Sequence, residues 1–214
     1  EARALANGRA AVMSKIEKPA AVDSFDEILR VSDGIMVARG DLGVELPVQA
    51  VPPIQKQLVR KCRAAAKPVI VATQMLESMI ESPMPTRAEV SDVANSIYEG
   101  TDAIMLSAES AAGLFPIEAV TTMNNVAIEV ERDPTYTSVL EASRSAKGKT
   151  VADSIVAAAR EIAETTDIKA IACFTFSGTT ASLTARERPR VPIIALTSNI
   201  NTARRLSLTW GTNC

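Results

Sequence analysis

The chain has 214 residues, of which 47% are hydrophobic and only 3% aromatic, with 23 basic and 25 acidic side chains and a net charge of -2. This length allows one large domain or one and a half ordinary ones, and the balanced charge excludes a broadly basic nucleic-acid binder. The absence of histidine excludes a Ser-His-Asp triad, a histidine-ligated zinc site and an imidazole base. Acid, base or metal chemistry must therefore come from carboxylates, lysines, hydroxyls and backbone amides.

The cysteine content and the apolar runs indicate the compartment. Cys62, Cys173 and Cys214 form an odd and scattered set, which is typical of free, buried thiols in a reducing environment. No apolar run approaches the ~20 residues that a bilayer span needs. We therefore expect a cytoplasmic protein with neither a membrane nor a nucleic acid as partner.

The charge changes sign along the chain, which predicts two units. Residues 1–140 carry 13 basic and 19 acidic side chains, whereas residues 141–214 carry 10 and 6. The change coincides with a polar stretch that contains Asp133, Pro134 and Gly148 and is typical of a connection between domains. The predicted division is a first unit over 1–132, a connection over 133–149 and a second unit over 150–214.

In the first unit, short apolar runs alternate with amphipathic ones, as in parallel strands joined by helices. Capping-box patterns at 24–27 and 86–89 and a first-turn proline at Pro116 predict helix starts, and Gly100 predicts a helix end. The runs start 24, 34 and 34 residues apart, a spacing typical of βα units in half of an eight-stranded barrel or in an open doubly wound sheet. The predicted strands are Ala10–Ile16, Gly34–Ala38, Pro68–Thr73 and Asp102–Leu106.

Every predicted strand ends in polar side chains, and a barrel builds its active site at the carboxyl ends of its strands. Lys15 and Glu17 are two residues apart, so they share a face if both lie on a strand. Ser107 and Glu109 would do the same if the last strand extends that far. Four consecutive polar strand ends therefore favour the barrel.

The types of these polar residues indicate the chemistry. Glu17 and Asp41 offer two carboxylates from adjacent strands, a donor set that suits a hard cation such as Mg²⁺ with a phosphorylated substrate. Gly40 leaves backbone amides open to an anionic oxygen. Lys15 would place a positive charge beside the metal, and the Thr73 hydroxyl could donate or relay a proton. Taken alone, however, the two carboxylates fit an ordinary surface ion-paired cluster equally well.

Six long strings of residues are more specific than any of these patterns. They are SKIE (14–17), DGIMVARGDLG (33–43), ATQMLESM (72–79), PTRAE (85–89), SDVAN (91–95) and DAIMLS (102–107). In order and spacing they closely resemble the pyruvate kinase family. The resemblance implies an α/β fold: the second half (strands 5–8) of a TIM (β/α)8 barrel, followed by part of an α/β C-terminal domain with parallel βαβ units.

The resemblance also implies a reaction and the residues that carry it. Pyruvate kinases are glycolytic transferases that move the phosphoryl group of phosphoenolpyruvate to ADP, giving ATP, and protonate the enolate to pyruvate. It implies that Glu17 and Asp41 hold Mg²⁺ or Mn²⁺, and that Lys15 stabilises the phosphoryl group and the enolate. It further implies that the Gly40 and Asp41 amides and the Thr73 hydroxyl hold the substrate carboxylate, with Thr73 also a candidate for proton delivery.

Family members are more than twice this long, so we expect this chain to be an internal fragment whose activity alone is open. The resemblance implies a homotetramer at full length and leaves a requirement for K⁺ open, since the K⁺ ligands would lie outside this chain. Two other interpretations remain: a non-catalytic fragment that binds an effector, and another Mg²⁺-dependent barrel enzyme acting on pyruvate or phosphoenolpyruvate, such as an aldolase.

The second unit is predicted to form a helix over 150–166 and then a βαβ unit, with strands over 170–174 and 191–197. Its strand-to-helix turn offers amides and hydroxyls suited to a phosphate, although a capped helix start with nothing bound fits as well. In pyruvate kinases the matching loop binds phosphorylated allosteric effectors. The candidate effector residues are Thr175, Ser177, Gly178, Thr179 and Thr180.

Other distinctive residues are interpreted as structural. Arg39 is expected to form an ion pair between elements, and Glu89 to cap a helix. The remaining basic cluster is interpreted as solvated faces and consists of Arg186, Arg188, Arg190, Arg204 and Arg205.

Overall fold

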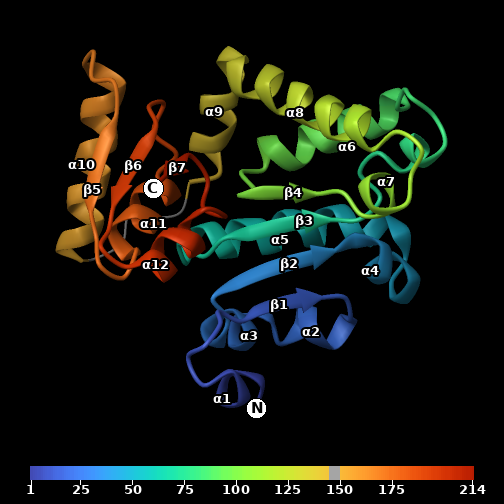
Figure 1. Cartoon of the computed structure of the whole chain (residues 1–214), viewed down its shortest axis with the longest axis horizontal. Helices are drawn as coiled ribbons and strands as arrows, with labels where there is room; N and C mark the ends of the chain where they lie inside the picture. The colour runs from blue at the N-terminus through green and yellow to red at the C-terminus, as the bar shows by residue number, and fades with distance from the viewer. Residues whose placement is uncertain (145–149) are drawn as a thin grey trace.

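Two parallel β-sheets organise the chain, as a computed structural model describing residues 1–144 and 150–214 shows (Figure 1). The first sheet has the order β1-β2-β3-β4 and the second the order β5-β6-β7. Every pairing is parallel, which confirms the predicted α/β class. The strands are β1 (Met13–Ile16), β2 (Gly34–Ala38), β3 (Val69–Ala72), β4 (Ala103–Met105), β5 (Ile171–Phe174), β6 (Ile193–Leu196) and β7 (Thr212–Asn213).

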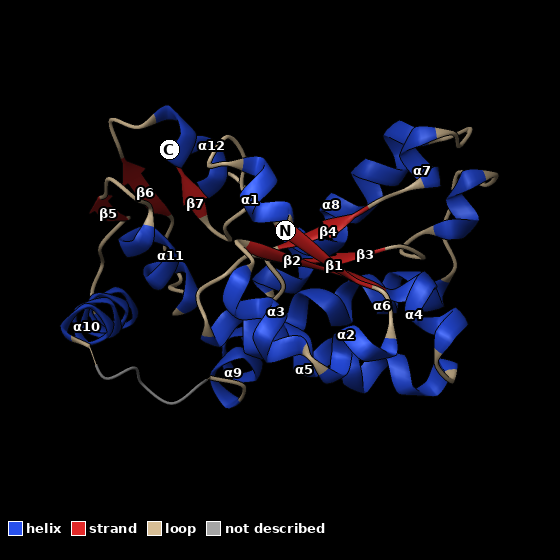
Figure 2. Ribbon diagram, turned by 90° about the horizontal axis from the view of Figure 1, so that it is seen from below, coloured by secondary structure: helices blue, strands red, loops and turns tan. Residues whose placement is uncertain are grey.

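Helices connect the strands of the first sheet, and α2, α3, α5 and α6 lie along one of its faces (Figure 2). Each strand-to-strand step therefore passes through at least one helix, as parallel pairing requires. The helices are α1 (Ala2–Ala6), α2 (Pro19–Asp23), α3 (Phe25–Val31), α4 (Arg39–Glu45), α5 (Val51–Ala64), α6 (Arg87–Tyr98), α7 (Ala108–Ala111) and α8 (Pro116–Arg132), with 3-10 turns η1 (Val48–Ala50) and η2 (Glu77–Ile80).

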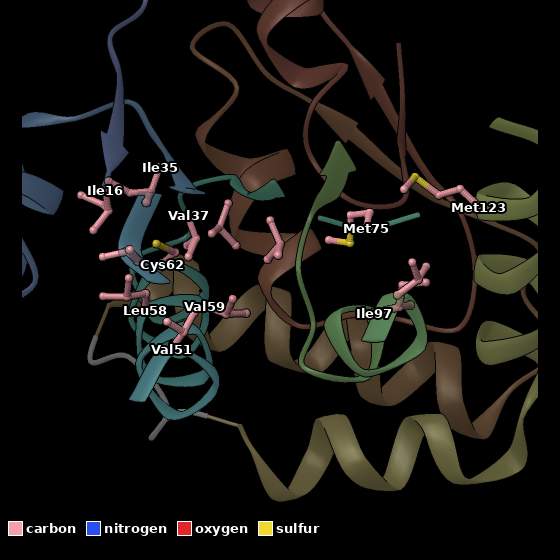
Figure 3. Packing of buried hydrophobic residues seen from close by; sticks show 14 of the residues in the cluster. Ile16, Ile35, Val37, Val51, Leu58, Val59, Cys62, Met75, Ile97 and Met123 are labelled. Carbon is pink, nitrogen blue, oxygen red and sulfur yellow. The ribbon is translucent and has the colours of Figure 1, made fainter. Parts of the chain in front are cut away.

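The main core lies between the first sheet and these helices (Figure 3). Successive side chains of a strand point to opposite faces, and Ile35 and Val37 of β2 are fully buried in this core. Val69 and Val71 of β3 are buried beside them, and Leu58 packs in from α5. Each such side chain contributes roughly 1.5–3 kcal/mol when it leaves water. This burial explains why the strands appear as apolar runs in the sequence.

The predicted ends of helices α6 and α8 are confirmed. The Thr86 hydroxyl accepts a hydrogen bond from the Glu89 amide at 3.3 Å, and the Glu89 carboxylate accepts one from the Thr86 amide at 2.7 Å. Gly100 follows the end of α6 with a left-handed φ of +86°, which glycine adopts at little cost. Pro116 occupies the first turn of α8, where its missing N–H is not needed.

The helix start predicted at residues 24–27 is confirmed, because α3 begins at Phe25, but Ser24 forms no capping box. Ser24 both ends α2 and precedes α3, and its side chain makes no capping hydrogen bond. Its backbone has φ -95° and ψ 19°, whereas a capping residue is typically extended so that its side chain reaches the next amides. The short distance between two successive helices therefore overrides the sequence pattern.

The second sheet has the predicted βαβ arrangement. α11 (Thr179–Arg186) joins β5 to β6, and α12 (Ile200–Leu206) joins β6 to β7. α10 (Val151–Thr165) precedes them and begins with a capping box formed by Thr150 and Asp153. A smaller core of mostly short side chains holds this part together: Cys173, Ala181, Ala185, Ile193, Ala195 and Leu206.

The stretch predicted to connect the two units contains a helix, α9 (Pro134–Ala142). Asp133 caps it by accepting a hydrogen bond from the Thr135 amide at 2.8 Å. Tyr136 packs against Tyr98 of α6, with the ring centroids 6.0 Å apart. The last part of the predicted connection, residues 145–149, lies outside the described residues.

The first part of the chain (residues 1–144, with the first sheet and α9) and the second part (150–214) meet at polar contacts, which we call the junction. The junction consists of Arg63, Gly100, Asp102, Arg188 and Trp210. Arg188 Nη2 donates to the Gly100 carbonyl at 2.6 Å and pairs with Asp102 Oδ1 at 3.1 Å. The Trp210 amide donates to the same carboxylate at 3.1 Å, and the Arg188 guanidinium lies 4.9 Å from the Trp210 ring centroid. The junction is therefore built from both parts.

The prediction that the arginines near the C-terminal end lie on solvated faces is wrong for two of them. The Arg188 side chain is only 2% exposed in its pair with Asp102. Arg186 is 13% exposed and pairs with Asp153 at 2.8 Å. Asp102 lies 86 residues from Arg188 in the chain, so no local pattern around Arg188 indicates this burial.

Cys62 and Cys173 are buried as predicted, but Cys214 is exposed. Burial raises the pKa of Cys62 to about 12, so this thiol stays protonated and inert near neutral pH. Among the described helices, none combines the length and the apolar character that crossing a bilayer requires.

Candidate active site

Three strand ends of the first sheet bring the predicted site residues together. Lys15 is on β1, and Glu17 follows that strand directly. Gly40 and Asp41 lie in the first turn of α4, which follows β2 without a loop, and Thr73 follows β3. Because the strands are parallel, all five residues lie at the carboxyl end of the sheet, opposite the side where the second part lies (Figure 1).

The ammonium group of Lys15 lies between two carboxylates. Its Nζ pairs with Asp41 Oδ2 at 2.8 Å and also with the Glu17 carboxylate. The hydrogen bonds to Asp41 and Glu17 raise the pKa of Lys15, and the same contact with Lys15 lowers the pKa of Asp41. Lys15 and Asp41 are therefore both charged across the neutral range.

The two carboxylates fit a hard divalent cation. Mg²⁺ is usually bound through one or two carboxylates, with water and substrate oxygens completing its shell. The side chains of Glu17 and Asp41 are 38% and 51% exposed, so water and substrate can reach them. Their ion-pair partner is the half-exposed Lys15 side chain on its flexible four-carbon stem, so they can exchange partners without disturbing the backbone. Among the described residues no larger cluster of His, Cys, Asp or Glu competes for a metal.

Gly40 and Thr73 form a second contact at the same edge. The Gly40 amide donates to Thr73 Oγ1 at 2.8 Å, and that hydroxyl donates to the Ala72 carbonyl at 2.6 Å. A Cβ on residue 40 would lie 3.3 Å from Thr73 Oγ1, so glycine allows the first turn of α4 to approach this closely. Holding a substrate carboxylate would require the Thr73 hydroxyl to turn away from Ala72.

The backbone at Thr73 and Gln74 is strained. Both have left-handed φ angles, 69° and 54°, which cost of order 1–3 kcal/mol for residues other than glycine. Arg39 holds them in place: its Nη2 donates to the Thr73 carbonyl at 2.7 Å and to the Gln74 carbonyl at 3.0 Å. Its Nη1 pairs with Asp92 at 2.6 Å, which confirms the predicted ion pair. Arg39 therefore positions the loop that carries Thr73.

Comparison with known proteins gives this arrangement a family. Residues 2–120 match the family model described as pyruvate kinase, barrel domain, and residues 153–214 match the model described as pyruvate kinase, alpha/beta domain. The chain belongs to the pyruvate kinase family. This confirms the resemblance seen in the sequence strings.

Individual pyruvate kinases cover almost the whole chain. The chain is 58% identical to the pyruvate kinase of Methylorubrum extorquens over 211 residues and 54% identical to one from Agrobacterium vitis. Each alignment includes 99% of this chain and 44% of the relative. The crystal structure of a pyruvate kinase from Cryptosporidium parvum superposes with a TM-score of 0.90 at 43% identity, covering 95% of this chain and 41% of that one. The chain thus spans less than half the length of these pyruvate kinases.

In this pyruvate kinase family member, Glu109 plays a part that the sequence did not reveal. Ser107 and Glu109 do not share a strand face, because the last strand does not extend that far: β4 ends at Met105 and α7 begins at Ala108. Glu109 is 2% exposed and accepts hydrogen bonds from the Ser107 amide at 2.7 Å and the Leu76 amide at 3.2 Å. It ties the loop after β4 to the loop after β3, next to Thr73. Only its place after a strand end hinted at this.

The predicted effector residues of the pyruvate kinase second domain lie together, Thr175, Ser177 and Gly178 in the loop after β5 and Thr179 and Thr180 in the first turn of α11. Thr175 Oγ1 accepts a hydrogen bond from the Gly178 amide at 3.0 Å, and the hydroxyls of Ser177 and Thr179 lie 2.9 Å apart. Ser177, Thr179 and Thr180 are exposed. Ser177 also lines a cavity of about 300 Å³ between this loop and the amino ends of β1 and β2.

Proposed function

We propose that this chain supplies catalytic residues for pyruvate kinase activity, the transfer of a phosphoryl group from phosphoenolpyruvate to ADP followed by protonation of the enolate to pyruvate. The observation that supports this most directly is the placement of Lys15 between Glu17 and Asp41 at the carboxyl edge of a pyruvate kinase barrel domain. Because the chain spans 44% of its relatives, the activity of the longer protein is part of the proposal.

The residues divide the work by their chemistry. Glu17 and Asp41 would hold Mg²⁺ or Mn²⁺, which when bound supplies charge neutralisation at the phosphoryl group. Lys15 is already charged, and its ammonium would be freed when the metal replaces it as the partner of the two carboxylates. It would then stabilise the transferring phosphoryl group and afterwards the enolate oxygen. The Thr73 hydroxyl and the amides of Gly40 and Asp41 would hold the substrate carboxylate, and Thr73 could deliver a proton.

We also propose that the first sheet is the second half, strands 5–8, of a (β/α)8 barrel, with the units divided at 1–132, 133–149 and 150–214. The alternation along the strands supports this, because one face packs on the helices while the other carries a second apolar layer. Met36, Ile70 and Met105 lie on that second face and outside the main core cluster. A homotetramer, and K⁺ ligands outside this chain, belong to the same proposal.

The second part would bind a phosphorylated effector at residues 175–180. The cavity beside Ser177 supports this, since it also includes Arg205, whose guanidinium is a suitable partner for a phosphate. Phosphate at this loop would meet the N-terminal amides of α11, which carry partial positive charge. Loss of effector response in Ser177→Asp, with basal turnover retained, is the expected result.

The test is pyruvate release from phosphoenolpyruvate, measured for this chain and its Lys15→Met variant with Mg²⁺ and ADP present. We expect turnover that falls at least a thousandfold in the variant, because a positive charge at the transferring group contributes several kcal/mol. Mn²⁺ binding, followed by electron paramagnetic resonance, should persist in Lys15→Met and weaken in Asp41→Asn.

Each alternative predicts a different result in the same assay. An effector-binding fragment without catalysis would bind Mn²⁺ but release no pyruvate from either protein. Another barrel enzyme of pyruvate chemistry would act without ADP. Full turnover in Lys15→Met would contradict the assignment of Lys15.

A further inference from the structure

A cavity of about 230 Å³ lies beside the junction, far from the Lys15 cluster. The first part of the chain contributes Arg63 of α5 and Tyr136 of α9 to its walls. The second part contributes Arg160 of α10 together with Arg188 and Trp210. Anything bound here would therefore touch both parts of the chain at once.

Three buried polar atoms in these walls lack a hydrogen-bond partner among the described residues. They are Tyr136 Oη, Arg160 Nε and Arg188 Nε. The exposed fractions of the three residues are only 7%, 8% and 6%. Buried polar groups in native proteins are almost always paired, and these are the only such side-chain atoms found in the described part of the chain. All three belong to residues that line one cavity, and all three can donate a hydrogen bond.

The charges around the cavity are unevenly matched. Arg63 donates to the carbonyls of Arg186 and Leu140 and pairs with no carboxylate among the described residues. Burial, and then the neighbouring Arg188, lower the pKa of Arg63 to about 10, which leaves it charged at neutral pH. The Arg190 guanidinium likewise donates only to backbone carbonyls.

The acidic residues in the walls already have partners. Glu141 pairs with Arg160 at 2.6 Å, Glu187 pairs with Arg186 at 3.1 Å, and Glu131 accepts a hydrogen bond from the Trp210 indole at 3.2 Å. Glu141 and Glu187 are thus matched by arginines and Glu131 is hydrogen-bonded, while two arginines, Arg63 and Arg190, have no carboxylate partner among the described residues and the three unpartnered donors remain. An anion with several acceptor oxygens matches both surpluses.

We propose that this cavity binds a small oxyanion, the phosphate or carboxylate group of a small metabolite, through Tyr136 Oη, Arg160 Nε and Arg188 Nε. The site is separate from the Lys15 cluster and from the loop over 175–180, and it does not depend on the proposed catalytic function. The residues that would bind the oxyanion come from both parts of the chain. A bound oxyanion therefore stabilises the docked arrangement of the two parts by mass action.

Trp210 provides a direct readout, because it is the only tryptophan of the chain and stacks on Arg188. The experiment titrates the purified chain with sodium phosphate at constant ionic strength, using sodium chloride as the reference. We expect a saturable change in tryptophan fluorescence and a melting temperature that rises with phosphate. Parallel titrations with sulfate and acetate distinguish a site for tetrahedral anions from one for carboxylates.

Two variants place the binding in this cavity. Tyr136→Phe removes an unpartnered hydroxyl and keeps the ring that packs on Tyr98, so the fold is retained. We expect it to weaken phosphate binding by about tenfold, and Arg160→Gln by more, because hydrogen bonds from charged donors are stronger. Arg132→Gln removes an exposed arginine outside both proposed phosphate sites, so it is the matched control and should bind phosphate as the unmodified chain does. Ser177→Ala changes the other proposed phosphate site, in the stretch 175–180, and should leave the fluorescence change of Trp210 in place.

The proposal is overturned by any of three results. These are no saturation beyond the chloride reference, saturation that Tyr136→Phe and Arg160→Gln both leave unchanged, or saturation that Ser177→Ala abolishes.

Discussion

The carboxyl edge of the first sheet and the junction both concentrate charge, but they hold it differently. At the edge, the side chains of Lys15 and Asp41 are 48% and 51% exposed. At the junction, those of Arg188 and Asp102 are 2% and 6% exposed. Exposed charges exchange partners with water and ligand at a small cost in free energy. Removing one member of a buried ion pair, in contrast, leaves the other charge buried without a partner. The comparison teaches that this chain keeps its exchangeable charges where chemistry is proposed and its fixed charges where its two parts meet.

The sharpest way to break this comparison is to remove Arg188. Arg188→Leu leaves the Asp102 carboxylate buried without its guanidinium, and we expect a loss of about 3–5 kcal/mol in the free energy of unfolding. Urea denaturation followed by circular dichroism measures it. Lys15→Met, which removes an exposed charge, serves as the matched control and should leave the urea midpoint nearly unchanged.

The double variant Arg188→Leu with Asp102→Leu tests the cause. Replacing both buried charges by apolar side chains should recover much of the lost free energy of unfolding, because no unpaired buried charge remains. A double variant as unstable as Arg188→Leu would show that packing, and not the unpaired carboxylate, dominates at the junction.

A second, smaller effect concerns the strained backbone at Thr73 and Gln74, at the carboxyl edge of the first sheet. Gln74 has a φ of 54°, so Gln74→Gly should raise the free energy of unfolding by up to about 1 kcal/mol. The urea midpoint of the variant measures this gain. Thr73→Gly relieves similar strain but removes the hydroxyl that accepts the Gly40 amide, so its gain should be smaller. A lower midpoint for Gln74→Gly would mean that the loop is not strained at this residue.

The smallest effect is a difference in acid sensitivity between Asp153 and Asp41. Hydrogen bonds from Thr150, and then the Arg186 contact, lower the pKa of Asp153 to about 2. A carboxyl whose folded pKa is lowered stabilises the fold above its unfolded pKa and loses that contribution as pH falls to the folded pKa. The stability gap between the unmodified chain and Asp153→Asn should therefore be full at pH 5 and shrink between about pH 4 and pH 2.

Asp41→Asn is the comparison for this measurement. The pKa of Asp41 is also lowered, but its side chain is half exposed and screened by solvent, so its pH-dependent gap should be narrower. Urea midpoints of both variants and of the unmodified chain, measured across this pH range, show which of the two stability gaps depends more on pH. An Asp41 gap as wide as that of Asp153 would contradict the distinction between exposed charges at the edge and charges that are shielded from water.

Much of this architecture could be predicted from the sequence, because local signals determine it. Apolar runs located the strands of the first sheet and β5 and β6 of the second to within a few residues, but not the two-residue strand β7. The Thr86 box and Pro116 located helix starts. Regular βα spacing then placed Lys15, Glu17 and Asp41 at one edge, since parallel strands end on the same side. The contact of Lys15 with both carboxylates agrees with that reasoning.

The features that could not be predicted depend on contacts between distant residues. Arg188 appeared to be one of several surface arginines, and only folding brings it to Asp102. Glu109 followed a strand end like other polar residues, yet its carboxylate is buried because two loops supply amides to it. Ser24 had the right neighbours for a cap, but the preceding helix fixed its backbone. Burial of charge and backbone conformation are tertiary properties, which local patterns do not encode.

The surroundings of Gly100 limit which substitutions its codon can tolerate during evolution. A Cβ at this residue would lie 3.0 Å from Leu140 of α9 and 3.5 Å from the Arg63 guanidinium, and the left-handed φ would disfavour it further. Any missense change in this codon therefore forces the end of the Leu140 side chain to shift and strains the backbone whose carbonyl receives Arg188. Descendant genes that preserve the docking of the two parts should keep glycine here, although the residue lies far from the proposed chemistry.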